Sequence, residues 1–130
     1  MTAKQNAAVM LVARIMLVLI FLLSGLSKIA TPDAVRGYME SVHIPGFLLW
    51  PTVLFEVGSG LLIMLGYRTR LVALLMAGFS LLTGLIFHSQ FDDQIQLTMF
   101  LKNISMVGGL LLLAAVGAGQ ISLDGKRNTV

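Results

Sequence analysis

The chain has 130 residues, of which 57% are hydrophobic and only 12% are charged, and its mean hydropathy is +0.91. Because ordinary soluble domains carry about 25% charged residues, this composition excludes a soluble globular protein and indicates a membrane protein. The net charge of +3 is small, and the nine Lys and Arg residues lie at the ends of apolar runs. This pattern does not predict nucleic acid as a partner, since a nucleic-acid-binding protein carries a continuous basic stripe.

No cysteine occurs in the chain, which excludes disulfides, thiolate metal sites and thiol chemistry by this chain itself. Any redox role must therefore use another group. No second composition regime marks a separate soluble domain, so we expect residues 1–130 to form a single domain.

Four apolar segments predict four transmembrane helices, over about residues 7–29, 47–66, 71–88 and 97–119. The first would rise roughly 34 Å as a helix, which is enough to span a bilayer with some tilt. A secretory signal is the alternative. Its apolar region would be shorter and would end at a small-residue cleavage site, whereas this segment ends at Ser27-Lys28, so we expect a retained helix.

A short amphipathic helix is predicted over about residues 32–42, between the first two spanning helices. Thr31 suits the N-cap, Pro32 the first helical position and Asp33 the first turn. The apolar residues that follow recur at helical spacing: Val35, Tyr38, Met39 and Val42. This pattern is typical of a helix that lies in the membrane interface. A structured loop is the alternative, because Gly37 interrupts the helix.

These elements predict an all-α fold, an integral membrane four-helix bundle with antiparallel up-down topology. The connection over residues 66–70 is very short, so the third helix must return beside the second. One side of the membrane then holds both termini and the second connection, with Lys4, Arg68, Arg70, Lys126 and Arg127. The other side is rich in acidic residues. By the positive-inside rule, both termini should be cytoplasmic.

The ionisable residues carried into the bilayer are the candidate site residues. These are Arg14, Glu56 and Lys102, with Lys28 and His88 near the outer boundary. Each buried charge costs about 2.5 to 3.5 kcal/mol, so these side chains should face protein or water and should be paired.

Helical spacing gives three stripes that should face inward. Their members are Arg14, Phe21, Gly25 and Lys28 on the first helix, Thr52, Glu56, Ser59 and Gly60 on the second, and Lys102, Ser105 and Gly109 on the fourth.

Glu56 is expected to pair with Arg14 or with Lys102, because a long basic side chain can reach its depth from either end. Such a pair would either form part of a polar pocket or only specify which helices pack together. Lys28, at a helix end, would by itself snorkel to the headgroups. His88 can carry a proton or can simply be interfacial. Asp92 and Asp93 lie nearby but do not have a metal-ligand spacing, so we predict no metal site.

Three stretches, ARIMLVLIFLLSGLSKI, FEVGSGLLIMLGYRTRLVAL and FLKNISMVGGLLLLAAVGAG followed by SLD, resemble the DoxX family of small four-helix bacterial membrane proteins. The resemblance runs from the first helix to Asp124, and it implies a multi-pass protein of the cytoplasmic (inner) membrane of a bacterium. The matching positions are Arg14, Gly25, Lys28, Glu56, Gly60, Gly66, Thr69, Arg70, Lys102, Asn103, Gly108 and Gly109. The match adds Asn103 to the candidate residues for ligand binding or proton handling.

The resemblance implies a role near membrane redox chemistry, since relatives include a subunit of a thiosulfate:quinone oxidoreductase and proteins of oxidative-stress complexes. Three functions stay open: a non-catalytic membrane subunit of a quinone-linked redox or oxidative-stress complex, a binder or transporter of a small or lipophilic solute, and a structural or assembly protein whose charges only pair helices. We do not expect the chain to be an enzyme on its own. Its partners would be the lipid bilayer, other membrane or redox subunits, or further copies of itself, and its one candidate cofactor is a quinone.

Overall fold

The computed structural model describes residues 1–128, which form helices and no strand. The elements are α1 (Ala3–Ala30), α2 (Pro32–Ser41), the 3-10 helix η1 (Gly46–Leu48), α3 (Leu49–Leu65), α4 (Thr69–Phe87), α5 (Gln94–Val116) and α6 (Leu123–Asn128). Among these residues, four segments are long and apolar enough to cross a membrane: α1, η1 with α3, α4, and α5. Thr129 and Val130, the end of the predicted polar tail, lie outside the described residues.

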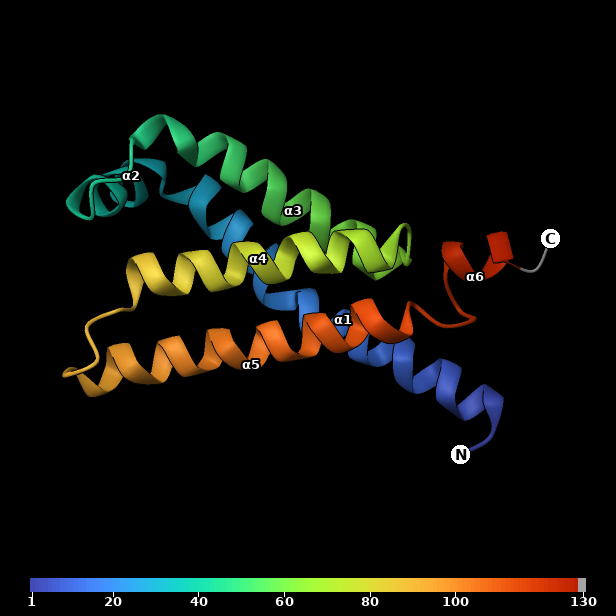
Figure 1. The fold of residues 1–130 in the computed structure, drawn as a ribbon. Helices are drawn as coiled ribbons and strands as arrows, with labels where there is room; N and C mark the ends of the chain where they lie inside the picture. The colour runs from blue at the N-terminus through green and yellow to red at the C-terminus, as the bar shows by residue number, and fades with distance from the viewer. Residues whose placement is uncertain (129–130) are drawn as a thin grey trace.

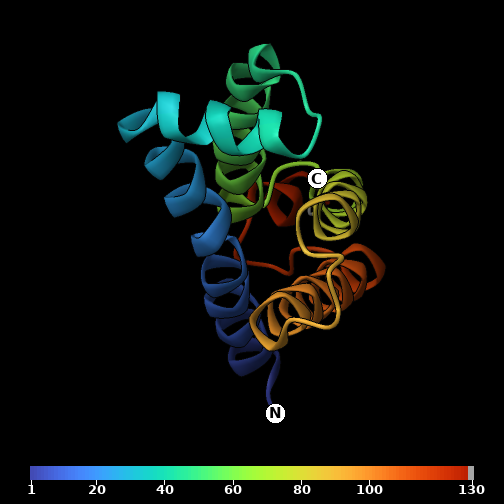
Figure 2. The same ribbon diagram turned by 90° about the vertical axis from the view of Figure 1, so that its left-hand side faces the viewer.

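The four long helices run antiparallel, as predicted (Figure 1). The start of α1, the helix α6 and the turn between α3 and α4 lie at one end of the bundle, which we call the terminal end. The other end, which we call the α2 end, holds α2 and the connection between α4 and α5. Figure 2 shows α2 running across the ends of α1 and α3. The predicted all-α membrane bundle with a short helix between its first two spanning helices is therefore confirmed.

Two helix pairs build the bundle, because α1 packs mainly on α3 and α4 packs mainly on α5 (Figure 2). Glycines allow the close approach within the first pair. A Cβ atom at Gly25 would lie 2.6 Å from Cγ2 of Val57, and one at Gly60 would lie 2.8 Å from Cδ2 of Leu22. Small residues are used in this way where membrane helices meet closely.

Two apolar clusters lie at different depths along the bundle. The larger joins all four long helices toward the terminal end and includes Val18, Ile63, Met76 and Leu110. The smaller lies beneath α2 and consists of Met39, Leu49 and Val53 with their partly buried neighbours. The predicted apolar stripe of α2 is confirmed in Met39, which is buried, while Tyr38 stacks on Phe87 at the end of α4 with 5.5 Å between ring centroids.

Local capping moves several predicted helix ends. The last long helix, expected over 97–119, spans Gln94–Val116, because the Asp93 side chain accepts from the Ile95 amide and Gly117 adopts a positive φ of 82°. The first helix starts at Ala3, where Thr2 and Gln5 form a capping box. The C-terminal stretch, expected as a polar tail, contains the additional helix α6.

Candidate functional site

A cavity of about 650 Å³ lies between the two helix pairs, toward the α2 end of the bundle. It borders the larger apolar cluster at Phe21 and reaches to α2, which covers the ends of the helices. Its walls are mainly apolar and include Phe21, Tyr38, Phe79, Leu82 and Met106. The polar side chains in the walls are those of Ser24, Ser27, Lys28, Thr52, Glu56, Ser80, Thr83, His88 and Asn103.

Lys28 and Glu56 form an ion pair in the cavity wall, between α1 and α3. The Lys28 Nζ lies 2.8 Å from Oε1 and 3.2 Å from Oε2 of Glu56, and it also donates to the Ser24 Oγ at 2.7 Å. The Glu56 side chain is 6% exposed and the Lys28 side chain 21%. Glu56 is therefore a buried, paired carboxylate, and Lys28 is the partner that keeps contact with open space.

The predicted partners of Glu56 are wrong, because the structure pairs it with Lys28 in place of Arg14 or Lys102. Side chains on a helix tilt toward its N-terminus. On α1 this direction leads Lys28 back into the bundle toward Glu56, and it leads Arg14 away from Glu56 toward the terminal end. The expectation that Lys28 only snorkels to the headgroups is overturned by the same contact.

Arg14 is 1% exposed and ties α1 to two other segments at the terminal end. Its Nη1 donates to the carbonyl oxygens of Ile63 at 3.2 Å and Met64 at 3.4 Å, and its Nη2 donates to that of Ile121. The first two carbonyls belong to the last turn of α3 and the third to the segment before α6. None of these carbonyls has a partner within a helix. Arg14 thus lies on the predicted inward face of α1 but outside the cavity.

Lys102 lies on the exposed face of α5, so the predicted inward stripe of that helix is wrong. Ser105 is exposed as well. The face of α5 that turns inward carries Leu110 and Leu113, which are buried in the larger apolar cluster, and Asn103, which hydrogen-bonds to α4. Lys102 therefore does not line the cavity.

His88 and Asn103 both line the cavity, at different depths. His88 caps α4, and its Nδ1 lies 3.0 Å from Oε1 of Gln96 across the α4–α5 connection. Asn103 donates from Nδ2 to the Ser80 carbonyl at 3.0 Å. Of the six candidates, the cavity thus brings together Lys28, Glu56, His88 and Asn103.

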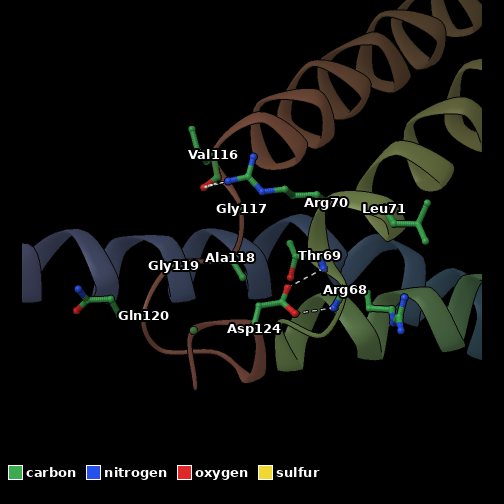
Figure 3. A pocket seen from close by; sticks show the side chains of 11 residues that line it. Arg68, Thr69, Arg70, Leu71, Val116, Gly117, Ala118, Gly119, Gln120 and Asp124 are labelled. Atoms are coloured by element: carbon green, nitrogen blue, oxygen red, sulfur yellow. Dashed lines mark hydrogen bonds between the residues drawn. The ribbon is translucent and has the colours of Figure 1, made fainter. Parts of the chain in front are cut away.

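A second pocket, of about 680 Å³, lies at the terminal end and is held by internal contacts (Figure 3). The Asp124 carboxylate accepts from the amides of Arg68 and Thr69, each at 2.8 Å, and so caps α4 from 55 residues away. Arg70 donates to the carbonyls of the last turn of α5, including Ala115 at 2.6 Å. The polar groups of this second pocket serve mainly to join helix ends.

Arg68, at the start of α4, lies on the surface of this second pocket. Its Nε donates to the Tyr67 hydroxyl at 3.5 Å, and this bond raises the pKa of the guanidinium above its ordinary value. Arg68 is therefore charged at every physiological pH and adds a positive charge to the terminal end.

Sequence reasoning missed two residues that matter to these sites. Ser80 lines the cavity, and Asp124 caps the start of α4 at the terminal end. Serine in an apolar helix gives no signal of its own, and a cap supplied by a distant segment has no local pattern. For Asp124 the one available signal was its place in the SLD stretch.

Known proteins with similar sequences include membrane proteins, in agreement with this architecture. The DoxX family model matches residues 9–89, which contain most of α1 and all of α2, α3 and α4. Inner membrane protein YqjF of Escherichia coli is 45% identical over 114 residues, which cover 88% of each chain. Inner membrane protein YphA of the same organism is 40% identical over 122 residues, covering 88% of this chain and 87% of that protein. The ER-derived vesicles protein ERV29 of Saccharomyces cerevisiae is 28% identical over 83 residues, which cover 60% of this chain and 27% of that protein.

No solved structure matches the chain. The two bacterial relatives match over nearly their whole length, and the family model covers more than half of the chain. The chain is therefore a multi-pass membrane protein that belongs to the DoxX family.

Proposed function

We propose that the protein binds a lipophilic small molecule with a polar head in the cavity at the α2 end, and that this ligand is a quinone. The observation that carries the proposal is the Lys28–Glu56 pair in the wall of an otherwise mainly apolar cavity of about 650 Å³. Small-molecule sites have this size and this composition, with few polar groups that fix the orientation of the ligand. The apolar walls suit the ring and tail, and the ion pair suits the head.

Lys28 has the chemistry to bind a carbonyl oxygen. An ammonium has three donor hydrogens. Ser24 accepts one of them at 2.7 Å and Oε1 of Glu56 accepts another at 2.8 Å, while Oε2 lies farther away at 3.2 Å. Because the bond to Oε2 is the longest of the three, a ligand oxygen would take its place, and Glu56 and His88 are the groups in the cavity that could hold a proton.

Lipid-facing residues in the cavity walls support entry from the bilayer. Ile20 and Leu82 line the cavity and are 53% and 57% exposed, so the cavity is open at these apolar residues. A ligand dissolved in the hydrocarbon core would meet these residues first. This route favours a lipid-soluble ligand over a small water-soluble anion.

In a redox complex the chain would be a non-catalytic membrane subunit. It has no cysteine, so it offers no thiol that could accept electrons from a sulfur compound. The electron donor would therefore be carried by another subunit, and this chain would hold the quinone beside it.

The protein is oriented in the inner membrane with both termini in the cytoplasm, which puts the cavity toward the outer side. Support comes from the basic residues at the terminal end, Lys4, Arg68, Arg70 and Lys126. Reporter fusions at the C-terminus test this orientation. A cytoplasm-active reporter should work there, and activity of a periplasm-dependent reporter would reverse the assignment.

Titration of the purified protein in lipid nanodiscs with a short-chain ubiquinone tests the proposed ligand. We expect saturable binding that Glu56→Gln weakens at least tenfold, with Lys102→Gln as a control outside the cavity. Leu82→Trp, at a lipid-facing position of the cavity wall, should weaken binding by filling space even if Glu56→Gln folds poorly. Unchanged binding in both cavity variants would remove the cavity from the function.

A further inference from the structure

The hydroxyl of Ser80 is buried in the cavity region without a partner. Ser80 is 1% exposed and lines the cavity, yet its Oγ makes no hydrogen bond within residues 1–128. Buried polar groups in native proteins are nearly always hydrogen-bonded, so such a hydroxyl calls for a specific explanation.

Other serines and threonines of the same bundle show what Ser80 lacks. Ser59 donates to the Phe55 carbonyl at 2.5 Å, and Ser105 donates to the Leu101 carbonyl at 3.1 Å. This bond to the carbonyl one turn earlier is the ordinary way in which a helical hydroxyl is satisfied in an apolar medium. Ser80 makes no such bond, so this lining residue of the cavity holds a buried donor that no described group satisfies.

Asn103 also lines the cavity, and its carboxamide is held against the backbone of Ser80. Its Nδ2 donates to the Ser80 carbonyl, which also accepts from Thr83 Oγ1 at 3.2 Å. Gly84 leaves room for the carboxamide, since a Cβ there would lie 3.0 Å from Nδ2. The Oδ1 of Asn103 makes no hydrogen bond to the described part of the chain. A residue with an unused donor and a residue with an unused acceptor are therefore joined through the Ser80 carbonyl on the α4–α5 wall.

We infer that Ser80 and Asn103 form a second polar anchor of the cavity, in which the Ser80 hydroxyl donates to an oxygen of the bound ligand. This inference rests on the proposed function. Lys28 and Glu56 come from the α1–α3 pair, whereas Ser80 and Asn103 come from the α4–α5 pair. The ligand class that satisfies both walls is a lipophilic ring with an oxygen at each of two opposite edges. A head with one oxygen would leave one anchor unused.

The test compares Ser80→Ala with the control Ser105→Ala, using the same short-chain ubiquinone in lipid nanodiscs. We expect Ser80→Ala to weaken binding about five- to tenfold, the effect of losing one neutral hydrogen bond, and Ser105→Ala to leave it unchanged. Without ligand, the unfolding midpoint of Ser80→Ala should stay the same or rise, because the substitution removes an unpaired buried hydroxyl. A purely structural role would instead lower this midpoint.

The infrared carbonyl band of the bound quinone gives an independent readout. In the unsubstituted protein one carbonyl stretch should shift to lower frequency through its bond to Ser80, and Ser80→Ala should abolish that shift. Equal affinity and an equal spectrum with and without Ser80 would overturn this inference alone, since water would then satisfy the hydroxyl. Absence of saturable binding by the unsubstituted protein would overturn the proposed function and this inference with it.

Discussion

Lys28 and Glu56 join α1 to α3 through an ion pair with 2.8 Å between Nζ and Oε1, in the wall of the cavity between the helix pairs. Glu56 is buried, and the Lys28 ammonium also donates a hydrogen bond to the Ser24 hydroxyl. The pair therefore does two things at once, because it fixes the packing of the first helix pair and supplies the charged part of the candidate ligand site.

Glu56→Gln should destabilise the ligand-free protein by about 3 kcal/mol, because it leaves the Lys28 ammonium without its counter-charge in a low-dielectric wall. Replacing both partners by Met should bring stability back to within about 1 kcal/mol, since neither charge then needs solvation. Reversible unfolding in mixed micelles measures both. Asp33→Asn, which breaks the exposed pair of Asp33 with Arg36, serves as the control and should have no measurable effect. A double variant as unstable as Glu56→Gln would contradict this account of the pair.

Arg14→Met should destabilise the protein by about 3 kcal/mol or more, because three carbonyls in two segments lose a buried, charge-assisted donor. Arg70→Met is the matched control. Arg70 also donates to carbonyls at a helix end, but it is exposed, so water can replace it and the loss should stay below about 1 kcal/mol. The same unfolding assay compares them, and equal losses would show that burial of Arg14 is not what matters.

Gly66→Ala should be strongly destabilising, by more than about 1 kcal/mol. Gly66 has a φ of 73°, and a Cβ there would lie 2.2 Å from Nη1 of Arg14 and 2.3 Å from Cβ of Ser122. Gly78 has open space around its missing Cβ, so Gly78→Ala should be neutral or should stabilise α4 by up to about 1 kcal/mol. Thermal unfolding distinguishes the two, and a harmless Gly66→Ala would show that the turn relaxes freely.

Asp124→Ala should cost about 1 kcal/mol, because the first amides of α4 lose both acceptor oxygens of their cap. Asp124→Asn keeps one acceptor and should lose less. Amide hydrogen exchange at Arg68 and Thr69 measures the effect locally. If exchange there is as slow in Asp124→Ala as in the unsubstituted protein, water or another group already satisfies these amides.

Helical periodicity predicted the inward faces of α1 and α3, because a charged residue in a bilayer-spanning helix must face protein. Arg14, Phe21 and Gly25 are buried, as are Glu56 and Ser59. The same argument failed for α5. Lys102 lies on its exposed face, where a lysine can extend toward the headgroups, and periodicity by itself does not say which face packs on a neighbour.

The identity of the partners could not be predicted, since pairing depends on side-chain direction and on helix crossing as well as on depth. Lys28 was assigned to the headgroups from its position near a helix end, and it reaches Glu56 because α1 side chains tilt back into the bundle. Ser80 was missed because its importance lies in a bond that it does not make. A missing hydrogen bond can be recognised only in a three-dimensional structure.

Native mass spectrometry of the protein, extracted in a mild detergent from the bacterial membranes that contain it, tests the central proposal most directly. We predict a noncovalently bound molecule with the mass of the membrane's quinone, one per chain, that is lost from Leu82→Trp and retained by Lys102→Gln. Detection of phospholipid alone, or the same quinone occupancy in the unsubstituted protein and in Leu82→Trp, would contradict a quinone site in this cavity.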